Sequence, residues 1–350
     1  MKVGTSGGSG WLTGVVDAVT AAEEMGYDEI SNGELQHDSM LSAALAAANS
    51  SRIGIGTFTI AFPRSPMVLA MEAWDIQHLS KGRFTIGLGT QVKGHNINRF
   101  STEWPGAPAP RIKEYITMMR AVWKSFQTGE KPDYAGKYYH YTLMTPAFNP
   151  GPIDYPAPKI GLGCVGDGMS RVAGEVADVV MPHGFMTDKY MRDVLLPNVA
   201  IGLKRGGRTW SDIEVTGGGF TVFGETDSEI EQKLDGLRRP ISFYGSTRSY
   251  HEIFEVHGLK DFGMQLHSMS LQGKWDDMRS AVTEDIVRVF AQTSTYDKLP
   301  EFVQEHREYA SRISLGDLPT QTPEQRERAK HIIAEVQKVK VPGVPKGLEI

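Results

Sequence analysis

This chain of 350 residues alternates eight strand-like segments with amphipathic helices, and the alternation predicts an α/β fold of the (β/α)8 TIM-barrel type. The clearest unit runs from Arg52 to Gln91, where an apolar strand, an irregular turn, a helix and a second strand follow one another. A βαβ unit of this kind implies parallel strands with helices packed outside them. In such a barrel we expect the functional site at the C-terminal ends of the strands.

The predicted elements follow in order along the chain. We expect strands at residues 2–5, 29–32, 53–58, 84–88, 159–164, 178–181, 214–223 and 311–315. We expect helices at residues 11–25, 40–48, 66–79, 111–128, 169–177, 197–206 and 299–310. Ser65 and Pro66 predict a helix start, and Gly26 and Gly129 predict helix ends. The second helix is expected to bury Met40, Leu41, Ala44, Leu45 and Ala48.

Three segments depart from this rhythm. Residues 130–158 are rich in proline and tyrosine, and they predict a long, ordered lid loop before the fifth strand. Residues 227–292 carry helical patterns without a convincing strand, which predicts a helical insertion between strands seven and eight. We expect a single barrel domain over residues 1–338 and an exposed C-terminal tail at 339–350.

Composition narrows the class of protein. With 40% hydrophobic and 23% charged residues, the chain is typical of a globular protein with a sizeable core. No apolar run reaches the roughly 18 residues that span a membrane, so we expect a cytoplasmic protein. A net charge of −5 argues against nucleic acid as a partner, and the single cysteine, Cys164, excludes an internal disulfide and a cysteine metal cluster.

A doubly wound sheet is the competing fold. Gly161, Gly163 and Gly166 spell G-x-G-x-x-G after a strand, as in dinucleotide-binding folds. The match lies in the middle of the chain, and the next strand ends in Met181 and Pro182 rather than in an acidic residue. The barrel is therefore the better prediction.

The turn after the fifth strand is the first candidate site. It joins a strand to a helix start, so free backbone N–H groups would face one point and could hold a phosphate. A tight turn in which the glycines serve only geometry is the alternative. The candidate residues of this turn are Cys164, Gly166, Asp167, Gly168 and Met169.

Polar residues follow four other predicted strands. Glu34 and His37 come after the second strand, although Asp38 and His37 could also simply cap the next helix. The remaining candidates are Thr57, Phe58 and Thr59 at the end of the third strand, Thr90, Gln91, His95 and Asn96 after the fourth, and His183 after the sixth. Hydroxyl and amide groups suit the edge of a polar heterocycle, and no persuasive metal-binding spacing is present.

Several motifs resemble a known family. They are Ala22–Asp28 (AEEMGYD), Ser65 with Pro66, Leu79–Gly89 (LSKGRFTIGLG) and Ala173–Asp178 (AGEVAD). The chain resembles the bacterial-luciferase-like superfamily from Lys2 to about Leu315, and within it the branch that uses the deazaflavin coenzyme F-420. Two positions differ from that branch: Leu35 stands where histidine often follows the acidic residue, and Asp167 where proline is common.

The resemblance implies a barrel with an insertion and a non-prolyl cis peptide at Thr57–Thr59, behind the ring of the cofactor. It implies Glu34 near the ring, polar cofactor contacts at Thr90 and Asn96, and a phosphate turn at Gly166–Gly168. His37 is a second candidate for proton transfer, and Gln91, His95 and His183 are candidates for substrate binding.

The leading hypothesis is therefore an oxidoreductase that transfers hydride between coenzyme F-420 and a small organic substrate, in a homodimer of the kind common in the superfamily. One alternative keeps the fold and uses reduced FMN and oxygen, as a luciferase-like monooxygenase. Another is a non-catalytic cofactor-binding barrel. An isomerase or aldolase barrel comes last, because Lys93 is the only nearby candidate for a Schiff base.

Overall fold

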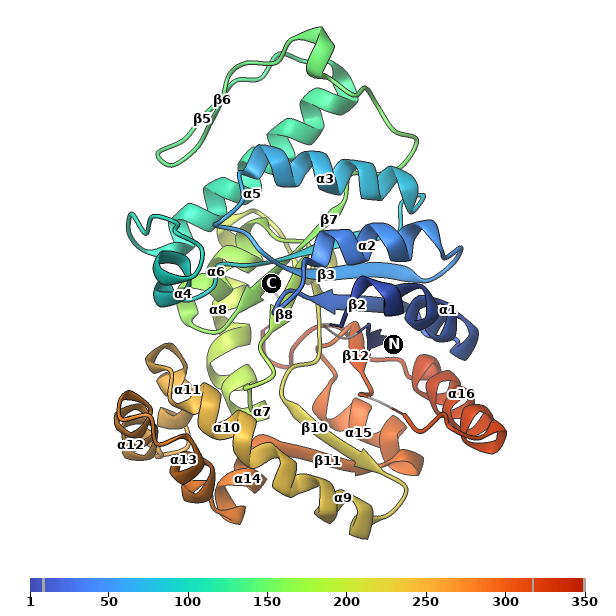
Figure 1. The fold of residues 1–350 in the computed structure, drawn as a ribbon, viewed down its shortest axis with the longest axis vertical. Helices are drawn as coiled ribbons and strands as arrows, with labels where there is room; N and C mark the ends of the chain where they lie inside the picture. The colour runs from blue at the N-terminus through green and yellow to red at the C-terminus, as the bar shows by residue number, and fades with distance from the viewer. Residues whose placement is uncertain (8–9, 317, 349–350) are drawn as a thin grey trace. The chain divides into compact units, whose positions relative to one another are not determined.

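The computed structural model describes residues 1–7, 10–316 and 318–348, and its fold is an α/β TIM barrel as predicted (Figure 1). Eight strands form one sheet in the order β12-β1-β2-β3-β4-β7-β8-β9. They are β1 (Lys2–Ser6), β2 (Glu29–Gly33), β3 (Gly54–Ile60), β4 (Phe84–Gly89), β7 (Lys159–Cys164), β8 (Val179–Pro182), β9 (Glu214–Val215) and β12 (Arg312–Ser314). All eight predicted strands are present, although the seventh is shorter than expected.

The chain divides into two compact units. The N-terminal unit comprises Lys2–Gly163 and Val172–Val180, and the C-terminal unit comprises Met1, Cys164–Arg171 and Met181–Ile350. The expectation of a single domain over residues 1–338 stays a prediction.

In the N-terminal unit, helices pack beside the parallel strands (Figure 1). They are α1 (Val15–Met25), α2 (Ser39–Ala48), α3 (Pro66–Leu79), α4 (Lys93–Asn98) and α5 (Pro108–Thr128). The predicted ends are confirmed: the Ser65 side chain accepts a hydrogen bond from the N–H of Met67, and Gly26 and Gly129 end their helices with left-handed φ values of 90° and 71°.

The predicted inner face of α2 is wrong. Met40 is buried, but Leu41 is 57% exposed, and the other buried apolar residues are Ala43, Ala46 and Ala47. Their small side chains allow α2 to approach β3 closely, so alanine rather than leucine occupies the buried stripe.

Successive residues of β3 point to opposite faces of the sheet. Thr57 and Thr59 point toward α2, where the Thr59 hydroxyl lies 2.9 Å from that of Ser39. Phe58 points to the other face and pairs in register with Gly33 of β2. Strand β3 pairs with both β2 and β4 at this end and contains no cis peptide bond, as is true throughout the described chain, so the expected cis peptide at Thr57–Thr59 is wrong.

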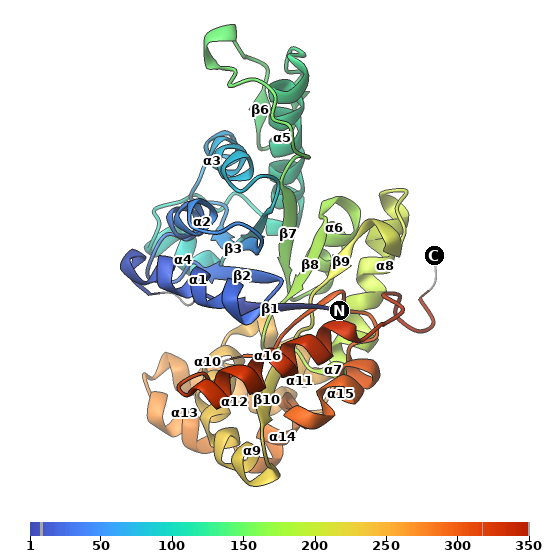
Figure 2. The same cartoon turned by 90° about the vertical axis from the view of Figure 1, so that its right-hand side faces the viewer.

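The segment 130–158 lies along the outer helices of the N-terminal unit, beside α5 and α3 (Figure 2). It contains the short strands β5 (Tyr134–Ala135) and β6 (His140–Tyr141). The Arg111 guanidinium donates to the Tyr139 hydroxyl at 2.8 Å, and the Gln77 amide donates to the Pro156 carbonyl at 2.7 Å. The loop is thus ordered as expected, and its role as a lid stays a prediction.

The C-terminal unit carries the predicted helical insertion. Its helices are α7 (Asp188–Tyr190), α8 (Leu196–Arg205), α9 (Asp227–Leu234), α10 (Arg238–Gly245), α11 (His251–Glu255), α12 (Lys260–Leu271), α13 (Trp275–Ala281), α14 (Glu284–Phe290), α15 (Leu299–His306) and α16 (Pro323–Lys338). Helix α6 (Asp167–Val176) begins in this unit and ends in the other.

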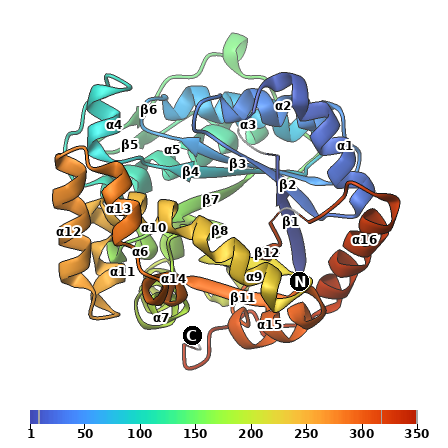
Figure 3. The ribbon, with the colours of Figure 1, turned by 60° about the horizontal axis from the view of Figure 1, so that its bottom comes forward.

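The predicted strand at 214–223 is interrupted. Three glycines, Gly217–Gly219, separate β9 from β10 (Phe220–Gly224), and Gly219 has a φ of 99°. Strand β10 pairs in parallel with β11 (Ala291–Thr295) in a separate two-stranded sheet (Figure 1). Figure 3 shows β11 between α14 and α15. The expectation of no strand in residues 227–292 is therefore wrong at its end, because the polar sequence of β11 lacks apolar alternation.

Among the described residues, no helix combines the length and the apolar character that a membrane span requires.

Candidate functional site

An open surface lies at the C-terminal ends of β2, β3, β4 and β7 in the N-terminal unit. Phe58 is 47% exposed there. Gly33 pairs with Phe58, and the pairs Ile60 with Gly89 and Leu88 with Leu162 place Gly89 and Gly163 on the same face of the sheet. We call Gly33, Phe58, Gly89 and Gly163 the glycine floor.

The space above the glycine floor is unfilled by the protein's own side chains. A Cβ added at Gly33 would meet no atom within 4 Å, and one at Gly89 would meet only a backbone oxygen at 3.9 Å. At Gly163 the nearest atom would be the Leu88 carbonyl oxygen at 3.4 Å, an ordinary contact. Any larger side chain at these positions would therefore project into the space where a flat ligand could lie against the sheet.

The hydroxyls of Thr57 and Thr59 are not part of this surface. Both residues are fully buried on the opposite face, where the Thr59 hydroxyl donates to that of Thr57 at 2.9 Å. The expectation that these two side chains contact a cofactor is corrected to a structural role against α2, and only Phe58 of the predicted trio reaches the open face.

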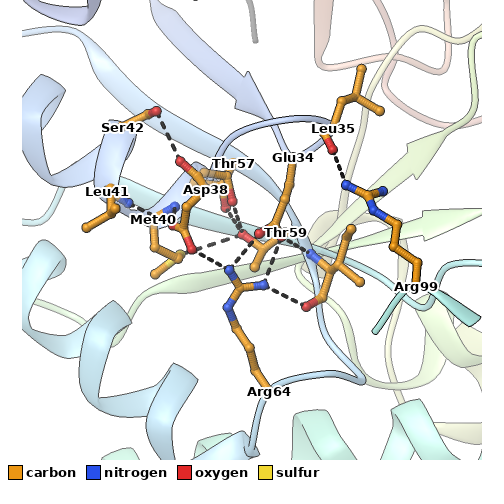
Figure 4. A network of polar contacts seen from close by, with 12 residues as sticks. Glu34, Leu35, Asp38, Met40, Leu41, Ser42, Thr57, Thr59, Arg64 and Arg99 are labelled. Carbon is orange, nitrogen blue, oxygen red and sulfur yellow. Dashed lines mark hydrogen bonds and ion pairs between the residues drawn. The ribbon is translucent and has the colours of Figure 1, made fainter. Parts of the chain in front are cut away.

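Glu34 is held in an ion-pair network, which Figure 4 shows. The Arg64 guanidinium donates to both carboxylate oxygens of Glu34, at 2.6 and 2.9 Å, and to Asp38 at 2.6 Å. The N–H of Ile60 also donates to Glu34. Burial lowers the pKa of Arg64, but the bonds and charges of Glu34 and Asp38 outweigh it and raise this pKa overall. Arg64 and the Ile60 N–H thus hold the Glu34 carboxylate in place beside β3.

The alternative roles of Asp38 and His37 are resolved in part. The Asp38 carboxylate caps α2 by accepting from the N–H groups of Met40 and Leu41, as the capping alternative predicted. The His37 ring lies 4.6 Å from the ring of Trp11, between centroids, and His37 is half-buried. The role of His37 in proton transfer therefore stays a prediction.

The residues after β4 form a tight loop. Gln91 is a non-glycine residue with a φ of 55°, and the Asn96 side chain donates to the carbonyls of Thr90 and Val92 at 2.9 and 3.2 Å. Asn96 is fully buried, whereas His95 is exposed on α4. Protein carbonyls therefore occupy the amide N–H groups of Asn96, and the expectation that Asn96 contacts a cofactor stays a prediction.

In the predicted phosphate turn of the C-terminal unit, a side chain occupies one of the backbone donors. The Asp167 carboxylate accepts from the N–H of Gly168 at 2.6 Å and pairs with Arg171 at 2.7 Å. The Cys164 thiol donates to the Met169 carbonyl at 3.8 Å, and burial raises the pKa of this thiol to about 12. Cys164 and Met169 thus hold the turn together, and the Gly168 N–H is occupied by the protein itself.

A second carboxylate faces this turn. The Glu252 carboxylate lies 3.7 Å from the position of a Cβ at Gly166, and it accepts from the Tyr190 hydroxyl at 3.1 Å. Two carboxylates, those of Asp167 and Glu252, thus lie at this turn with one guanidinium, that of Arg171, and the excess of negative groups disfavours a bound phosphate. The tight-turn alternative explains these contacts better.

His183 follows β8 inside an aromatic cluster of the C-terminal unit. Its ring lies 4.5 Å from Tyr244 and 5.0 Å from Tyr250, between centroids, and its Nδ1 accepts from the N–H of Phe185 at 3.0 Å. Burial lowers the pKa of His183 to about 4, so the ring is neutral near pH 7 and its proton resides on Nε2. It can therefore donate a hydrogen bond without carrying charge.

Sequence reasoning missed Arg64, the centre of the Glu34 network. The residue stands alone between two prolines in Pro63-Arg64-Ser65-Pro66, directly after β3, and a lone cation at a strand's C-terminal end was the available signal. Within residues 1–7, 10–316 and 318–348, no three His, Cys, Asp or Glu side chains gather as a metal site.

Comparisons with known proteins concern the family and the fold of the chain. A family model described as luciferase-like monooxygenase matches residues 2–311. An uncharacterized protein of Mycobacterium tuberculosis is 37% identical over 289 residues, covering 82% of this chain and 85% of that protein. An F-420-dependent glucose-6-phosphate dehydrogenase of Microbacterium testaceum is 29% identical over 218 residues, covering 57% and 61%. The F-420-dependent tetrahydromethanopterin reductase of Methanopyrus kandleri shares the fold, with a TM-score of 0.73, 18% identity and coverage of 98% and 99%.

Proposed function

Because the chain belongs to the luciferase-like monooxygenase family, we propose that it is an oxidoreductase that binds the deazaflavin coenzyme F-420 on the glycine floor and acts on a small organic substrate. The relative of Microbacterium testaceum, an F-420-dependent dehydrogenase, supports this choice of cofactor. Bound deazaflavin would supply the hydride acceptor or donor, a chemistry that no protein side chain provides.

The glycine floor is the observation that carries the proposal. Three glycines leave a flat patch of backbone around an exposed aromatic ring, and a Cβ at each would enter the same open space. A planar tricyclic ring fits such a patch, because it gains contact area with Phe58 and excludes water from the sheet. In the described chain, a Cβ added at Gly33 would meet no atom within 4 Å, and one at Gly89 or Gly163 would meet backbone atoms only, so no side chain packs against these glycines at that distance.

The side chains around the floor supply position and charge. Arg64 donates to both carboxylate oxygens of Glu34 and so positions this side chain beside β3. His37 is left as the candidate for moving a proton at its ring nitrogen. The carboxylates at the Gly166–Gly168 turn do not favour a phosphate contact, so the proposal concerns only the ring of the cofactor.

We further propose that the protein forms a homodimer through an apolar surface of the N-terminal unit. Val68, Met71 and Leu79 of α3 and Phe148 of the 130–158 segment are between 45% and 76% exposed. Met71 and Phe148 line one depression of this surface, and exposed apolar patches often mark interaction sites. Light scattering on the purified protein tests this, and a monomer mass would contradict it.

Titration of the purified protein with oxidised coenzyme F-420, and separately with FMN, tests the proposal. We expect tight binding of the deazaflavin, read by fluorescence and calorimetry, and much weaker binding of FMN. A preference for FMN would move the protein to the oxygen-using monooxygenases. Binding of neither would contradict the cofactor assignment and favour a barrel with another role.

A matched pair of variants tests where the ring binds. Gly89→Val places a branched side chain above the floor, and we expect it to weaken deazaflavin binding at least about 100-fold, because even modest steric overlap outweighs the stacking contact. Gly94→Val is the control: it lies five residues later on α4, exposed, with no atom within 4 Å of the added Cβ. Equal affinities in the two variants would show that the ring binds elsewhere.

A further inference from the structure

Gln91 adopts a conformation that is unfavourable for its residue type. In the described chain three non-glycine residues have a left-handed φ: Lys81, Gln91 and Ser101, at 55°, 55° and 52°. Of these, only Gln91 follows the C-terminal end of a barrel strand, two residues after Gly89 of the glycine floor. Strain that persists at such a place points to a functional reason.

Asn96 holds Gln91 in this conformation. Its side-chain nitrogen donates to the carbonyl of Thr90 at 2.9 Å and to that of Val92 at 3.2 Å, the two carbonyls that flank Gln91. Backbone hydrogen bonds fix Asn96 itself. The Asn96 N–H donates to the Val92 carbonyl at 3.2 Å, and the Thr102 N–H donates to the Asn96 carbonyl at 2.8 Å. One buried amide therefore fixes both sides of Gln91.

The other half of the Asn96 amide shows why an asparagine is present. Its Oδ1 is fully buried and accepts no hydrogen bond within the described chain. A buried polar atom without a partner is unfavourable, and an apolar residue such as leucine would avoid that penalty. Asparagine at this position is thus explained by its two donated hydrogen bonds rather than by packing.

We infer that Asn96 is a positioning residue and that Gln91 is the specificity-determining residue it positions, an inference that rests on the proposed function. Gln91 offers both a donor and an acceptor on one side chain. It therefore suits a neutral ligand edge with neighbouring carbonyl and N–H groups, such as the pyrimidine edge of a deazaflavin ring on the glycine floor. Asn96, assigned from sequence to cofactor contact, acts through Gln91 instead.

A double-mutant cycle on ligand binding tests the link between the two residues. The proteins are wild type, Gln91→Gly, Asn96→Leu and the double variant, and the readouts are the Kd for oxidised coenzyme F-420 and the absorption maximum of the bound ring. We expect each single change to weaken binding about tenfold and to shift the absorption maximum, and the double variant to be no worse than either. Losses that multiply to about 100-fold, or a Gln91→Gly variant with unchanged affinity and spectrum, would overturn the inference.

A second cycle uses melting temperatures, without any ligand, to test whether Asn96 holds Gln91 in its left-handed conformation. Lys81→Gly is the matched control, because Lys81 has the same φ and lies in the turn before β4, away from Asn96. Glycine relieves left-handed strain, so we expect Gln91→Gly and Lys81→Gly to shift the melting temperature of the wild type alike. In the Asn96→Leu background, we expect Gln91→Gly to leave the melting temperature unchanged, whereas Lys81→Gly still shifts it. If Gln91→Gly still shifts the melting temperature there, Asn96 does not impose the conformation of Gln91.

The two cycles separate the possible failures. If the wild-type protein binds no deazaflavin, both the proposed function and the ligand contact of Gln91 are wrong. The melting-temperature cycle still decides whether Asn96 holds the conformation of Gln91. If wild type binds deazaflavin and the binding cycle is additive, the proposed function stands and the role of Asn96 falls.

Discussion

The strand ends of the N-terminal unit and the turn after β7 share a sequence pattern, glycines mixed with polar residues behind an apolar strand, but the structure fills them differently. At Gly33, Gly89 and Gly163 the glycines leave open space beside an exposed Phe58. In the C-terminal unit, Asp167 occupies the N–H of Gly168. His183, also in that unit, is enclosed by aromatic rings.

The difference teaches that the partners of the polar groups, rather than the motif, decide whether a strand end can take a ligand. Where a side chain already satisfies the backbone donors, as Asp167 does, the glycines serve the geometry of a turn. Where the glycines of the described chain have no side-chain atom within 4 Å of an added Cβ, the strand ends leave room beside the sheet. The predictions below test each half of this contrast.

Among the substitutions, the largest effect at pH 7 is expected from Arg64→Met. The change leaves the Glu34 carboxylate largely buried without its guanidinium partner, and loss of one partner of such a pair costs about 3 kcal/mol of unfolding free energy. Urea denaturation at pH 7 measures it. The double variant with Glu34→Gln should recover much of the loss, because no unpaired charge remains. An Arg64→Met protein as stable as wild type would mean that the network is not structural.

The second effect concerns His183 and pH. Its pKa is about 4 in the folded protein against 6.5 for an ordinary histidine, so below pH 6.5 the unfolded state binds a proton that the folded state does not. The contribution of His183 to the free energy of unfolding is therefore fully present above about pH 6.5. Between about pH 6.5 and pH 4 this contribution falls by up to about 1.4 kcal/mol per pH unit.

The comparison protein for this pH effect is His183→Asn, whose amide oxygen can still accept from the Phe185 N–H. Burial also lowers the pKa of His251 and His257, so only the difference between wild type and variant isolates His183. Denaturant unfolding from pH 4 to 7.5 should show the stability advantage of wild type shrinking as pH falls. A constant difference would mean that His183 is protonated alike in both states.

The fold was predictable from sequence because periodicity and caps are local. The helix over 111–128 shows this, because its apolar residues recur at helical spacing and all of the following are buried: Ile112, Tyr115, Ile116, Met119, Val122, Trp123 and Phe126. Strand β11 escaped prediction because its polar residues pair by backbone alone. The candidate site was harder still: Glu34 was visible after β2, but its partner Arg64 lies 30 residues later, and only the fold brings them together.

The alternation along β3 supplies the third prediction. Thr59→Val keeps the shape of the side chain but removes the hydroxyl that bonds Ser39 and Thr57, which leaves two buried hydroxyls short of a partner. We expect a loss of about 1.5 kcal/mol in unfolding free energy with unchanged deazaflavin affinity. Thr117→Val is the control, because that hydroxyl is exposed on α5 and bonds only the Lys113 carbonyl within its own helix. Weakened binding in Thr59→Val would place Thr59 at the ligand after all.

Phe58→Ala reverses this pattern and gives the smallest change in free energy. The ring is 47% exposed in the protein alone, so its loss should alter unfolding only slightly, whereas a stacked ligand ring would lose its aromatic neighbour. We expect deazaflavin binding to weaken about tenfold, equal to about 1.4 kcal/mol. Phe148→Ala removes a phenylalanine that is 76% exposed on the 130–158 segment and should leave affinity unchanged. If both variants bind like wild type, the open face of β3 is not where the ring lies, because a ring seated on the glycine floor must touch Phe58.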